Sequence, residues 1–169
     1  MKINIGCGDI AKEGYVGIDI NPAAKGADII HDFDTLDICQ VDEIYGRMCL
    51  HHFPSPEKTL RKCKNICKGR IFFEAEPIRG IFVPERLAYY FSPFRDMKRN
   101  PEEKAPTIIQ WKLWARKAGV SIKMRPIRLG RGFSRFQNRA VDFLMLMVMF
   151  YIGNPFRPLS YWSVDMEVK

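Results

Sequence analysis

The fold of this chain is decided near its start, by the stretch Ile3-Asn4-Ile5-Gly6-Cys7-Gly8-Asp9. An apolar run leads into two glycines one residue apart, which predicts a buried strand followed by a tight turn. Because Gly6 and Gly8 lack a Cβ, the backbone can take positive φ there and a ligand can approach it closely. A second apolar run follows, Gly17-Ile18-Asp19-Ile20. Asp19 is therefore expected near the end of the second strand, where it can accept hydrogen bonds from ribose hydroxyls.

The glycine pattern departs from the dinucleotide-binding fingerprint, because position 11 is Ala11 where the third glycine would stand. Only residues 9–15 join the first two strands, whereas parallel neighbours usually need a crossover of about a dozen residues or more, commonly a helix. We therefore expect a reduced first crossover. One alternative is a plain turn between two core strands. A nicotinamide-dependent oxidoreductase would share the turn and Asp19, but it would normally show the third glycine and a full first helix.

The rest of the chain alternates between strand and helix patterns. A helix is expected from Ser55-Pro56-Glu57, which supply a cap, a proline at the first position and an acid, to Gly69. A second helix is expected over 107–118, closed by Gly119. Strands are expected over 27–33, 41–46, 70–75, 120–129 and 161–168, with Pro77 ending the third of them. This alternation predicts an α/β, Rossmann-like, mostly parallel sheet with an antiparallel last strand and helices on both faces.

Length and composition set the class of protein. The 169 residues suit a single domain, and the hydrophobic fraction of 47% is that of an ordinary globular protein. The chain starts without a hydrophobic signal region, and its five cysteines are odd in number with no framework spacing. We therefore expect a cytoplasmic protein with reduced thiols. Net charge is +8, but residues 1–77 carry 10 Lys and Arg against 12 Asp and Glu, whereas residues 78–169 carry 17 against 7.

Three parts of the single domain 1–169 are distinguished by composition. Residues 1–77 form the half with the glycine turn. Residues 78–106 mix aromatic and basic residues with prolines, which predicts a lid or substrate-facing insertion, or else a packed irregular connection. Residues 107–169 complete the sheet and include the apolar run 140–152, expected as a buried or groove-lining helix because it is too short to span a bilayer. The basic loop 130–135 is interpreted as a solvated turn rather than a phosphate site.

The chain resembles the class I S-adenosylmethionine-dependent methyltransferases, most closely the small type-11 group and related short-crossover proteins. Residues 3–8 match the first motif of that family, and residues 17–22, 27–33 and 41–45 match its second, third and fourth strands. Residues 50–60 are similar to its post-strand segment and following helix, and residues 68–74 to the turn into the fifth strand. The resemblance is dense over residues 3–77 and thin afterwards. Asn4 departs from the family, which often has an acid at that position.

The resemblance implies S-adenosylmethionine as cofactor and a role for each matching residue. Asp19 would hold the ribose hydroxyls, Ile20 would pack on the adenine ring, and Asp32 with Phe33 would border the adenine edge. The methionine part of the cofactor would lie over the glycine turn. The full set of implied cofactor-binding residues is Gly6, Cys7, Gly8, Asp19, Ile20, Asp32, Phe33, Arg47 and Met48.

His51 and His52 are the candidate catalytic residues, because they follow the fourth strand, where acceptors approach in this fold. A general base is needed only when the methyl acceptor carries a proton that must leave. The alternative for His52 is a structural histidine at a helix start. No metal is expected, since the Cys63-x3-Cys67 spacing beside Cys49 and His51 lies on a helix face rather than in a zinc knuckle.

The acceptor is expected to be a small molecule or a glycan. The basic second half leaves RNA possible as acceptor, or a peripheral contact with a membrane surface. A further alternative is a methyltransferase-like domain without activity that serves as a binding module. The oligomeric state is open.

Overall fold

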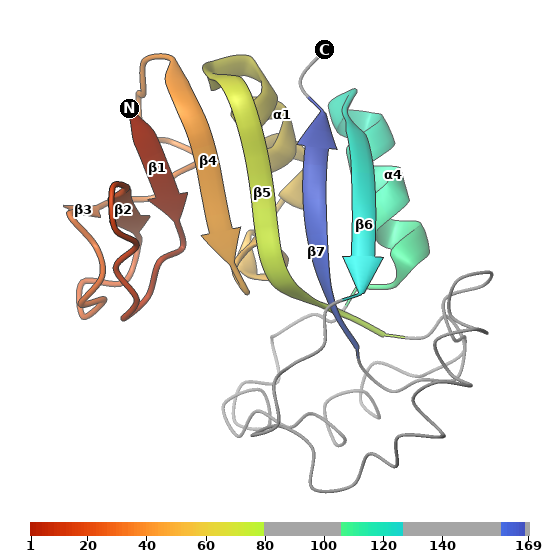
Figure 1. Cartoon of the computed structure of the whole chain (residues 1–169), viewed down its shortest axis with the longest axis horizontal. Helices are drawn as coiled ribbons and strands as arrows, with labels where there is room; N and C mark the ends of the chain where they lie inside the picture. Colours follow the sequence, from red (N-terminus) through yellow and green to blue (C-terminus); the bar gives the residue numbers. More distant parts are fainter. Residues whose placement is uncertain (80–105, 127–159, 168–169) are drawn as a thin grey trace, which may run out of the picture.

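The seven-stranded mixed sheet is the framework of the molecule (Figure 1). The computed structural model describes residues 1–79, 106–126 and 160–167. The strand order is β3-β2-β1-β4-β5-β7-β6. The first five strands pair in parallel, and β7 runs antiparallel between β5 and β6. The structure thus confirms the mostly parallel, Rossmann-like α/β sheet with an antiparallel last strand.

The elements lie close to the ranges expected from the sequence. The strands are β1 (Lys2–Ile5), β2 (Val16–Asp19), β3 (Ile29–Ile30), β4 (Val41–Arg47), β5 (Cys67–Ile78), β6 (Ser121–Pro126) and β7 (Ser160–Glu167). The helices are η1 (Leu50–His52, a 3-10 turn), α1 (Pro56–Ile66) and α4 (Ile108–Ala118).

Two expected boundaries around β5 are wrong. The helix α1 ends at Ile66 rather than at Gly69, because Cys67 already takes an extended conformation and pairs with Val41 of β4. Gly69 lies inside β5, where a Cβ would come within 2.3 Å of the Asp42 carbonyl oxygen, so it is needed for close strand packing. At the other end, Pro77 does not stop the strand. It pairs in β5 with Tyr161 of β7, and β5 continues to Ile78.

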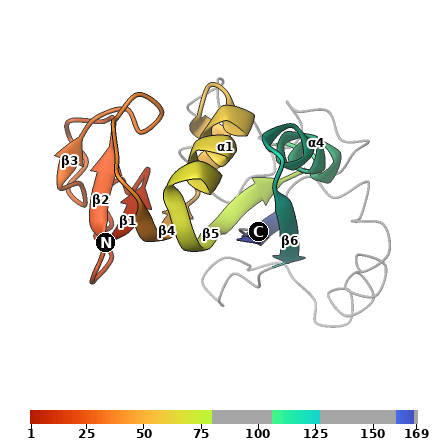
Figure 2. The ribbon, with the colours of Figure 1, turned by 90° about the horizontal axis from the view of Figure 1, so that it is seen from above.

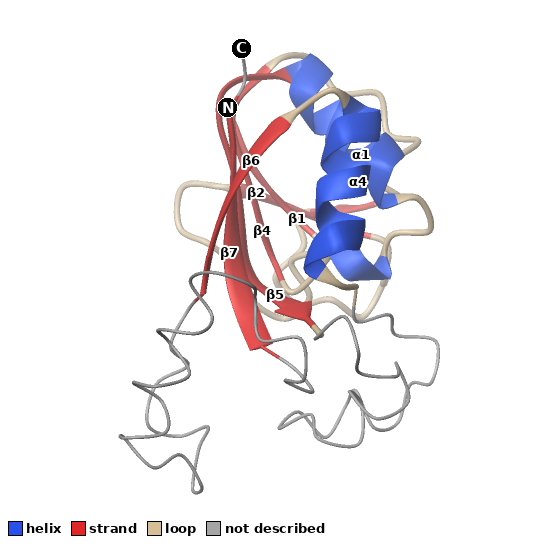
Figure 3. Ribbon diagram, turned by 90° about the vertical axis from the view of Figure 1, so that its right-hand side faces the viewer, coloured by secondary structure: helices blue, strands red, loops and turns tan. Residues whose placement is uncertain are grey.

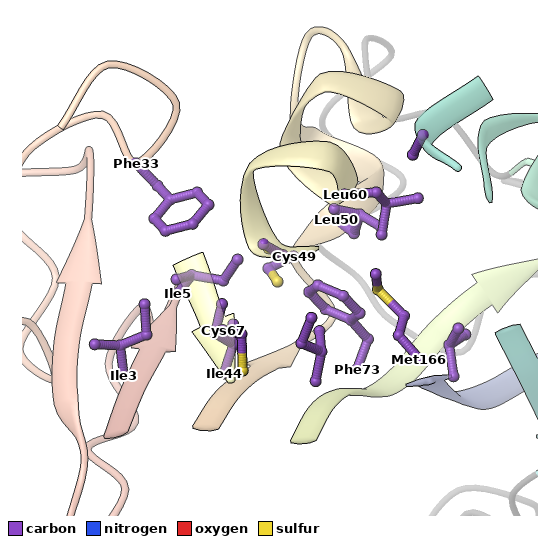
Figure 4. Packing of buried hydrophobic residues seen from close by; sticks show 14 of the residues in the cluster. Ile3, Ile5, Phe33, Ile44, Cys49, Leu50, Leu60, Cys67, Phe73 and Met166 are labelled. Carbon is purple, nitrogen blue, oxygen red and sulfur yellow. The ribbon is translucent and has the colours of Figure 1, made fainter. Parts of the chain in front are cut away.

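Both described α helices lie on the same face of the sheet (Figures 2 and 3). Successive side chains of a strand point to opposite faces of the sheet, so every second side chain points toward these helices. A row of register partners on this face forms the core: Ile3, Ile44, Ile71 and Met166. Figure 4 shows these strands packing beneath α1, with Leu60 of the helix and Cys49 and Leu50 of the preceding turn. Helices on the other face remain a prediction, because the described residues place no α helix there.

The reduced first crossover is confirmed. Residues 6–15 form turns and bends without a helix. The linker is attached to the sheet face opposite α1 through Lys12, whose Nζ lies 3.8 Å from the centre of the Tyr45 ring and 5.0 Å from that of Tyr15. The Tyr15 and Tyr45 rings meet edge-on at 6.0 Å. These cation–π and aromatic contacts hold in place a connection that has no helix of its own.

Several expectations fall on undescribed residues. The insertion 78–106 lies almost entirely outside the described ranges, as do the basic loop 130–135 and the apolar run 140–152. Within the described part of the chain, no helix has both the length and the apolar character that crossing a membrane requires.

Candidate functional site

The glycine turn after β1 brings two different glycines to the carboxyl edge of the sheet. Gly6 has φ +58°, and an added Cβ would lie 2.5 Å from the Cβ of Cys49, so this glycine is required by packing against the segment after β4. Gly8 has φ +54°, and an added Cβ would meet no atom of the described residues within 4 Å. The turn is therefore packed on the β4 side at Gly6 and open at Gly8, where a ligand can approach the backbone.

Asp19 joins this turn to the end of β2. Its Oδ2 accepts a hydrogen bond from the Gly8 N–H at 2.8 Å, and its Oδ1 accepts one from the Asn21 N–H at 2.8 Å. A carboxylate oxygen can accept more than one hydrogen bond, so both oxygens retain acceptor capacity for a ligand. The carboxylate thus shapes the turn and faces the same region as Gly8.

The surroundings of Asp19 and Gly8 include two groups suited to a ligand. Ile20, directly after Asp19, keeps 68% of its surface exposed, which is unusual for a large apolar side chain beside a strand end. Asn4 is buried in β1 and donates from Nδ2 to the Ile10 carbonyl at 3.3 Å, while its Oδ1 has no hydrogen-bond partner among the residues that the structure describes. A buried acceptor left unpaired is uncommon, and a donor on a bound molecule would satisfy it.

The loop after β2 closes over the glycine turn, which the sequence pattern did not indicate. The Gly26 N–H donates to the Gly8 carbonyl at 2.9 Å, and the Lys25 N–H donates to Asp9 Oδ1 at 3.2 Å. A Cβ on Gly26 would come within 2.5 Å of the Ile10 backbone, so glycine is needed for this close approach. Gly26 in a polar loop was the only feature of the sequence that could have indicated this contact with the glycine turn.

The two residues expected at the adenine edge have different surroundings. Asp32 follows β3 and is half-buried, and its Oδ1 accepts the Asp34 N–H at 2.9 Å. Phe33 is 3% exposed and belongs to the core (Figure 4). Its ring meets that of Phe53 edge-on at 6.3 Å. The Asp32 side chain thus keeps some exposed surface, whereas the Phe33 ring packs in the core, and a role for either at the adenine edge stays a prediction.

The end of β4 supplies the next group of predicted residues. Arg47 is the last residue of β4 and is exposed. Met48 is half-buried, has φ +50°, and donates its N–H to the Glu74 carbonyl at 3.0 Å. A positive φ costs a non-glycine residue about 1–2 kcal/mol, so the sharp turn of the chain at Met48 reduces the free energy of unfolding by about that amount.

The two histidines are adjacent in η1 but differ in their environment. Their rings lie 4.0 Å apart, centre to centre. His51 is buried, and its Nδ1 lies 2.9 Å from Glu76 Oε2. His52 reaches the surface, although neighbouring atoms desolvate its ring. This desolvation, followed by repulsion from His51, lowers the pKa of His52 to about 4. Asp19 contributes a smaller raising effect on that pKa, so η1 and the glycine turn share one electrostatic environment.

Glu76 is the functional candidate that sequence reasoning missed. It is fully buried, and its Oε1 accepts the Cys49 and Leu50 N–H groups at 2.9 and 3.2 Å, while Oε2 contacts His51. Burial would raise the pKa of Glu76, but the hydrogen bond and the electrostatic attraction of His51, followed by the hydrogen bonds from Cys49 and Leu50, outweigh it and lower the pKa. An acid at the end of a buried strand was the available signal, as it was for Asp19.

Four of the five cysteine thiols are buried. Within residues 1–79, 106–126 and 160–167, no three His, Cys, Asp or Glu side chains are grouped so that they could hold a metal ion. Burial, with a smaller contribution from Glu76, raises the pKa of the Cys49 thiol well above its usual value. Burial likewise raises the pKa of Cys63. Both sulfurs are therefore protonated at neutral pH, which disfavours metal binding.

Comparisons with known proteins identify the fold. No family model and no curated protein sequence matches the chain. Among solved structures, it is similar to the YcgJ protein of Bacillus subtilis (TM-score 0.58, 13% identity, covering 98% of this chain and 89% of that one). It is also similar to phosphoethanolamine N-methyltransferase 2 of Haemonchus contortus, solved with S-adenosyl-L-methionine (TM-score 0.60, 14% identity, 99% and 48%). A third similar structure is the plantazolicin methyltransferase BamL, solved with a triazolic desmethylPZN analog and SAH, S-adenosylhomocysteine (TM-score 0.55, 15% identity, 99% and 77%).

Proposed function

We propose that this chain, which has the fold of the class I S-adenosylmethionine-dependent methyltransferases, binds S-adenosylmethionine at the glycine turn and transfers its methyl group to a small-molecule or glycan-type acceptor. The observation that carries the proposal is the hydrogen bond from the Gly8 N–H to Asp19, beside open space at Gly8 and the exposed Ile20. Asp19 would hold the ribose hydroxyls, and Ile20 would pack on the adenine.

The chemistry required of the protein is modest. When bound, S-adenosylmethionine supplies a methyl group on a cationic sulfur, and transfer is an in-line displacement. This chain's own residues would align the two reactants and exclude water. The turn Gly6-Cys7-Gly8, with Arg47 and Met48 after β4, would hold the methionine part. His51 and His52 lie after β4 and would serve where the acceptor carries a proton that must leave.

The acceptor class is proposed from a structural neighbour. The Haemonchus neighbour is by name an enzyme that methylates a small molecule, which supports a small acceptor. The alternative is an RNA methyltransferase that uses the basic second half of the chain. Binding to bulk RNA that weakens steeply with added salt would favour this alternative.

Calorimetry with a matched pair of glycine variants tests the cofactor site. Gly8 and Gly14 both have positive φ and open space around an added Cβ, but only Gly8 belongs to the proposed site. Both Gly8→Ala and Gly14→Ala should lose similar stability. Because the new methyl group in Gly8→Ala would project into the ligand's space, we expect it to weaken SAH binding about tenfold or more. Gly14→Ala should bind like the wild type.

Three results would contradict the proposal. Equal losses of SAH affinity in the two variants would place the ligand elsewhere. Heat with NAD and none with SAH would favour the oxidoreductase. No heat with either ligand would favour a binding module without activity.

A further inference from the structure

Glu76 lies at the end of β5 and directs all of its described hydrogen bonds to the turn that carries the two histidines. One oxygen accepts the Cys49 and Leu50 N–H groups, and the other faces His51 Nδ1 at 2.9 Å. The carboxylate is 0% exposed. A buried carboxylate is retained only where such partners compensate for lost water. It therefore fixes both the backbone of η1 and the ring of His51.

The backbone on both sides of this contact is strained. Within the described residues, only Met48 and Ala75 are non-glycine residues with positive φ, at +50° and +58°. The β5–β7 register shifts between Phe73 and Glu76, so a bulge at Ala75 redirects the Glu76 side chain to the η1 side. Strain of this kind is maintained only where the surrounding structure enforces it, and it concentrates at functional sites.

The hydrogen bonds of His51 select one neutral tautomer. A carboxylate only accepts hydrogen bonds, so Nδ1 must carry the proton that it shares with Glu76. Nε2 is buried, and within the described part of the chain it has no hydrogen-bond partner. A proton on Nε2 would be a buried donor without an acceptor, which is more costly than an unused lone pair. The geometry thus leaves Nε2 with its lone pair free.

His51 belongs to a segment that packs on the glycine turn, Gly6-Cys7-Gly8, of the proposed cofactor site. Cys49, two residues before His51, is the residue that an added Cβ on Gly6 would strike. The titratable groups around His51 in the described residues are Glu76, His52 and the Cys49 thiol, with Asp19 beyond them. The pKa of His52 is lowered, because its ring is desolvated and is repelled by His51.

We infer that Glu76 is a positioning residue that holds His51 as the Nδ1–H tautomer, so that His51 Nε2 receives the proton of the methyl acceptor. The inference rests on the proposed function. In the step, the acceptor's hydroxyl oxygen or amine nitrogen forms a bond to the methyl carbon, and the carbon–sulfur bond breaks. The electron pair of that bond stays on sulfur, giving S-adenosylhomocysteine, and the acceptor's proton passes to Nε2. Glu76 stabilises the resulting imidazolium without taking the proton.

Long-range proton–nitrogen NMR spectra of the full-length 15N-labelled chain at pH 7.5 test this inference, since only three histidines contribute signals. We expect His51 to be protonated at Nδ1 and bare at Nε2. In Glu76→Gln, the amide oxygen can still accept the Cys49 and Leu50 N–H groups, but the amide nitrogen donates to Nδ1. The proton should therefore move to Nε2. Glu74→Gln is the matched control, because Glu74 accepts from the Tyr45 hydroxyl instead, and its His51 signals should match wild type.

Each outcome is decisive. An Nε2–H or doubly protonated His51 in the wild type would overturn the inference even if Glu76→Gln failed to fold, and so would an unchanged tautomer in a folded Glu76→Gln. A purely structural Glu76 would alter the melting temperature without this tautomer exchange. Saturating SAH should shift the resonance of His51 Nε2. An unchanged Nε2 resonance with SAH bound would contradict this inference but not the proposed function. Failure of wild-type calorimetry with SAH would instead contradict the proposed function.

Discussion

At the scale of single residues, two carboxylates at strand ends organise the site, and the sequence reveals only one of them. Asp19 is predictable because an apolar strand ends directly on it, beside a glycine turn. The role of Glu76 is not predictable, although Glu76 is also an acid near an expected strand end, because strict alternation would direct its side chain away from η1. The bulge at Ala75 reverses that direction. A bulge of this kind interrupts the alternation of side chains between the two faces of the sheet, and the sequence pattern does not indicate where it occurs.

His52 makes folding stability depend on pH. Its pKa is lowered to about 4 in the folded chain, against an ordinary value near 6.5 when unfolded. The unfolded state therefore binds the proton more readily, so this contribution to stability is complete above pH 6.5 and is lost as pH falls toward 4. Because the side chain is partly exposed, we expect a loss of about 1 kcal/mol.

Urea unfolding at pH 7 and pH 4.5 measures this effect. His52→Asn removes the titrating ring, so its loss of stability between the two pH values should be smaller than that of the wild type. Identical pH dependence in the two proteins would show that His52 is not desolvated.

At the scale of elements, the second helix was predictable almost to the residue, whereas the start of β5 was not. The helix α4 begins after Thr107, which forms a capping box, and ends at Gly119, which takes the left-handed conformation. Both features depend only on residues close together in the sequence, so they can be predicted from it. Gly69 looks like the same kind of helix end. The position of Gly69 is set instead by the pairing of β5 with β4. This pairing joins segments that are distant in the sequence, so the spacing of apolar residues in a helix does not predict it.

The two helix starts predict losses of different size when the residue at the cap position is replaced by alanine. The Thr107 side chain accepts the Gln110 N–H at 3.2 Å, and the Gln110 side chain accepts the Thr107 N–H at 2.7 Å. Thr107→Ala should therefore reduce the free energy of unfolding by about 1 kcal/mol in urea titrations. Ser55 occupies the same position before α1 but makes no side-chain capping bond, so Ser55→Ala should cost less than about 0.5 kcal/mol. A larger effect at Ser55 than at Thr107 would contradict the helix geometry.

At the scale of the whole molecule, strand order brings distant segments to one edge of the sheet. The segments after β1, β2, β4 and β5 are neighbours there because β2-β1-β4-β5 is the order in space. The glycine turn, Asp19, the histidine pair and Glu76 come together for this reason, in the arrangement typical of ligand sites in open α/β sheets. Sequence spacing predicts each strand, but the contact between Gly6 and Cys49 and the Glu76 bonds follow only from packing.

Calorimetric titration of SAH into matched Asp19→Asn and Asp28→Asn variants is the most direct test of the central claim, that Asp19 binds the cofactor. Each carboxylate accepts a backbone N–H eleven residues earlier, from Gly8 at 2.8 Å and from Gly17 at 2.7 Å, so both variants lose a comparable structural bond. Because hydrogen bonds to a charged group contribute about 1.5–3 kcal/mol, Asp19→Asn should bind SAH about 10- to 100-fold more weakly, and Asp28→Asn like the wild type. Wild-type affinity in a folded Asp19→Asn variant would contradict the claim.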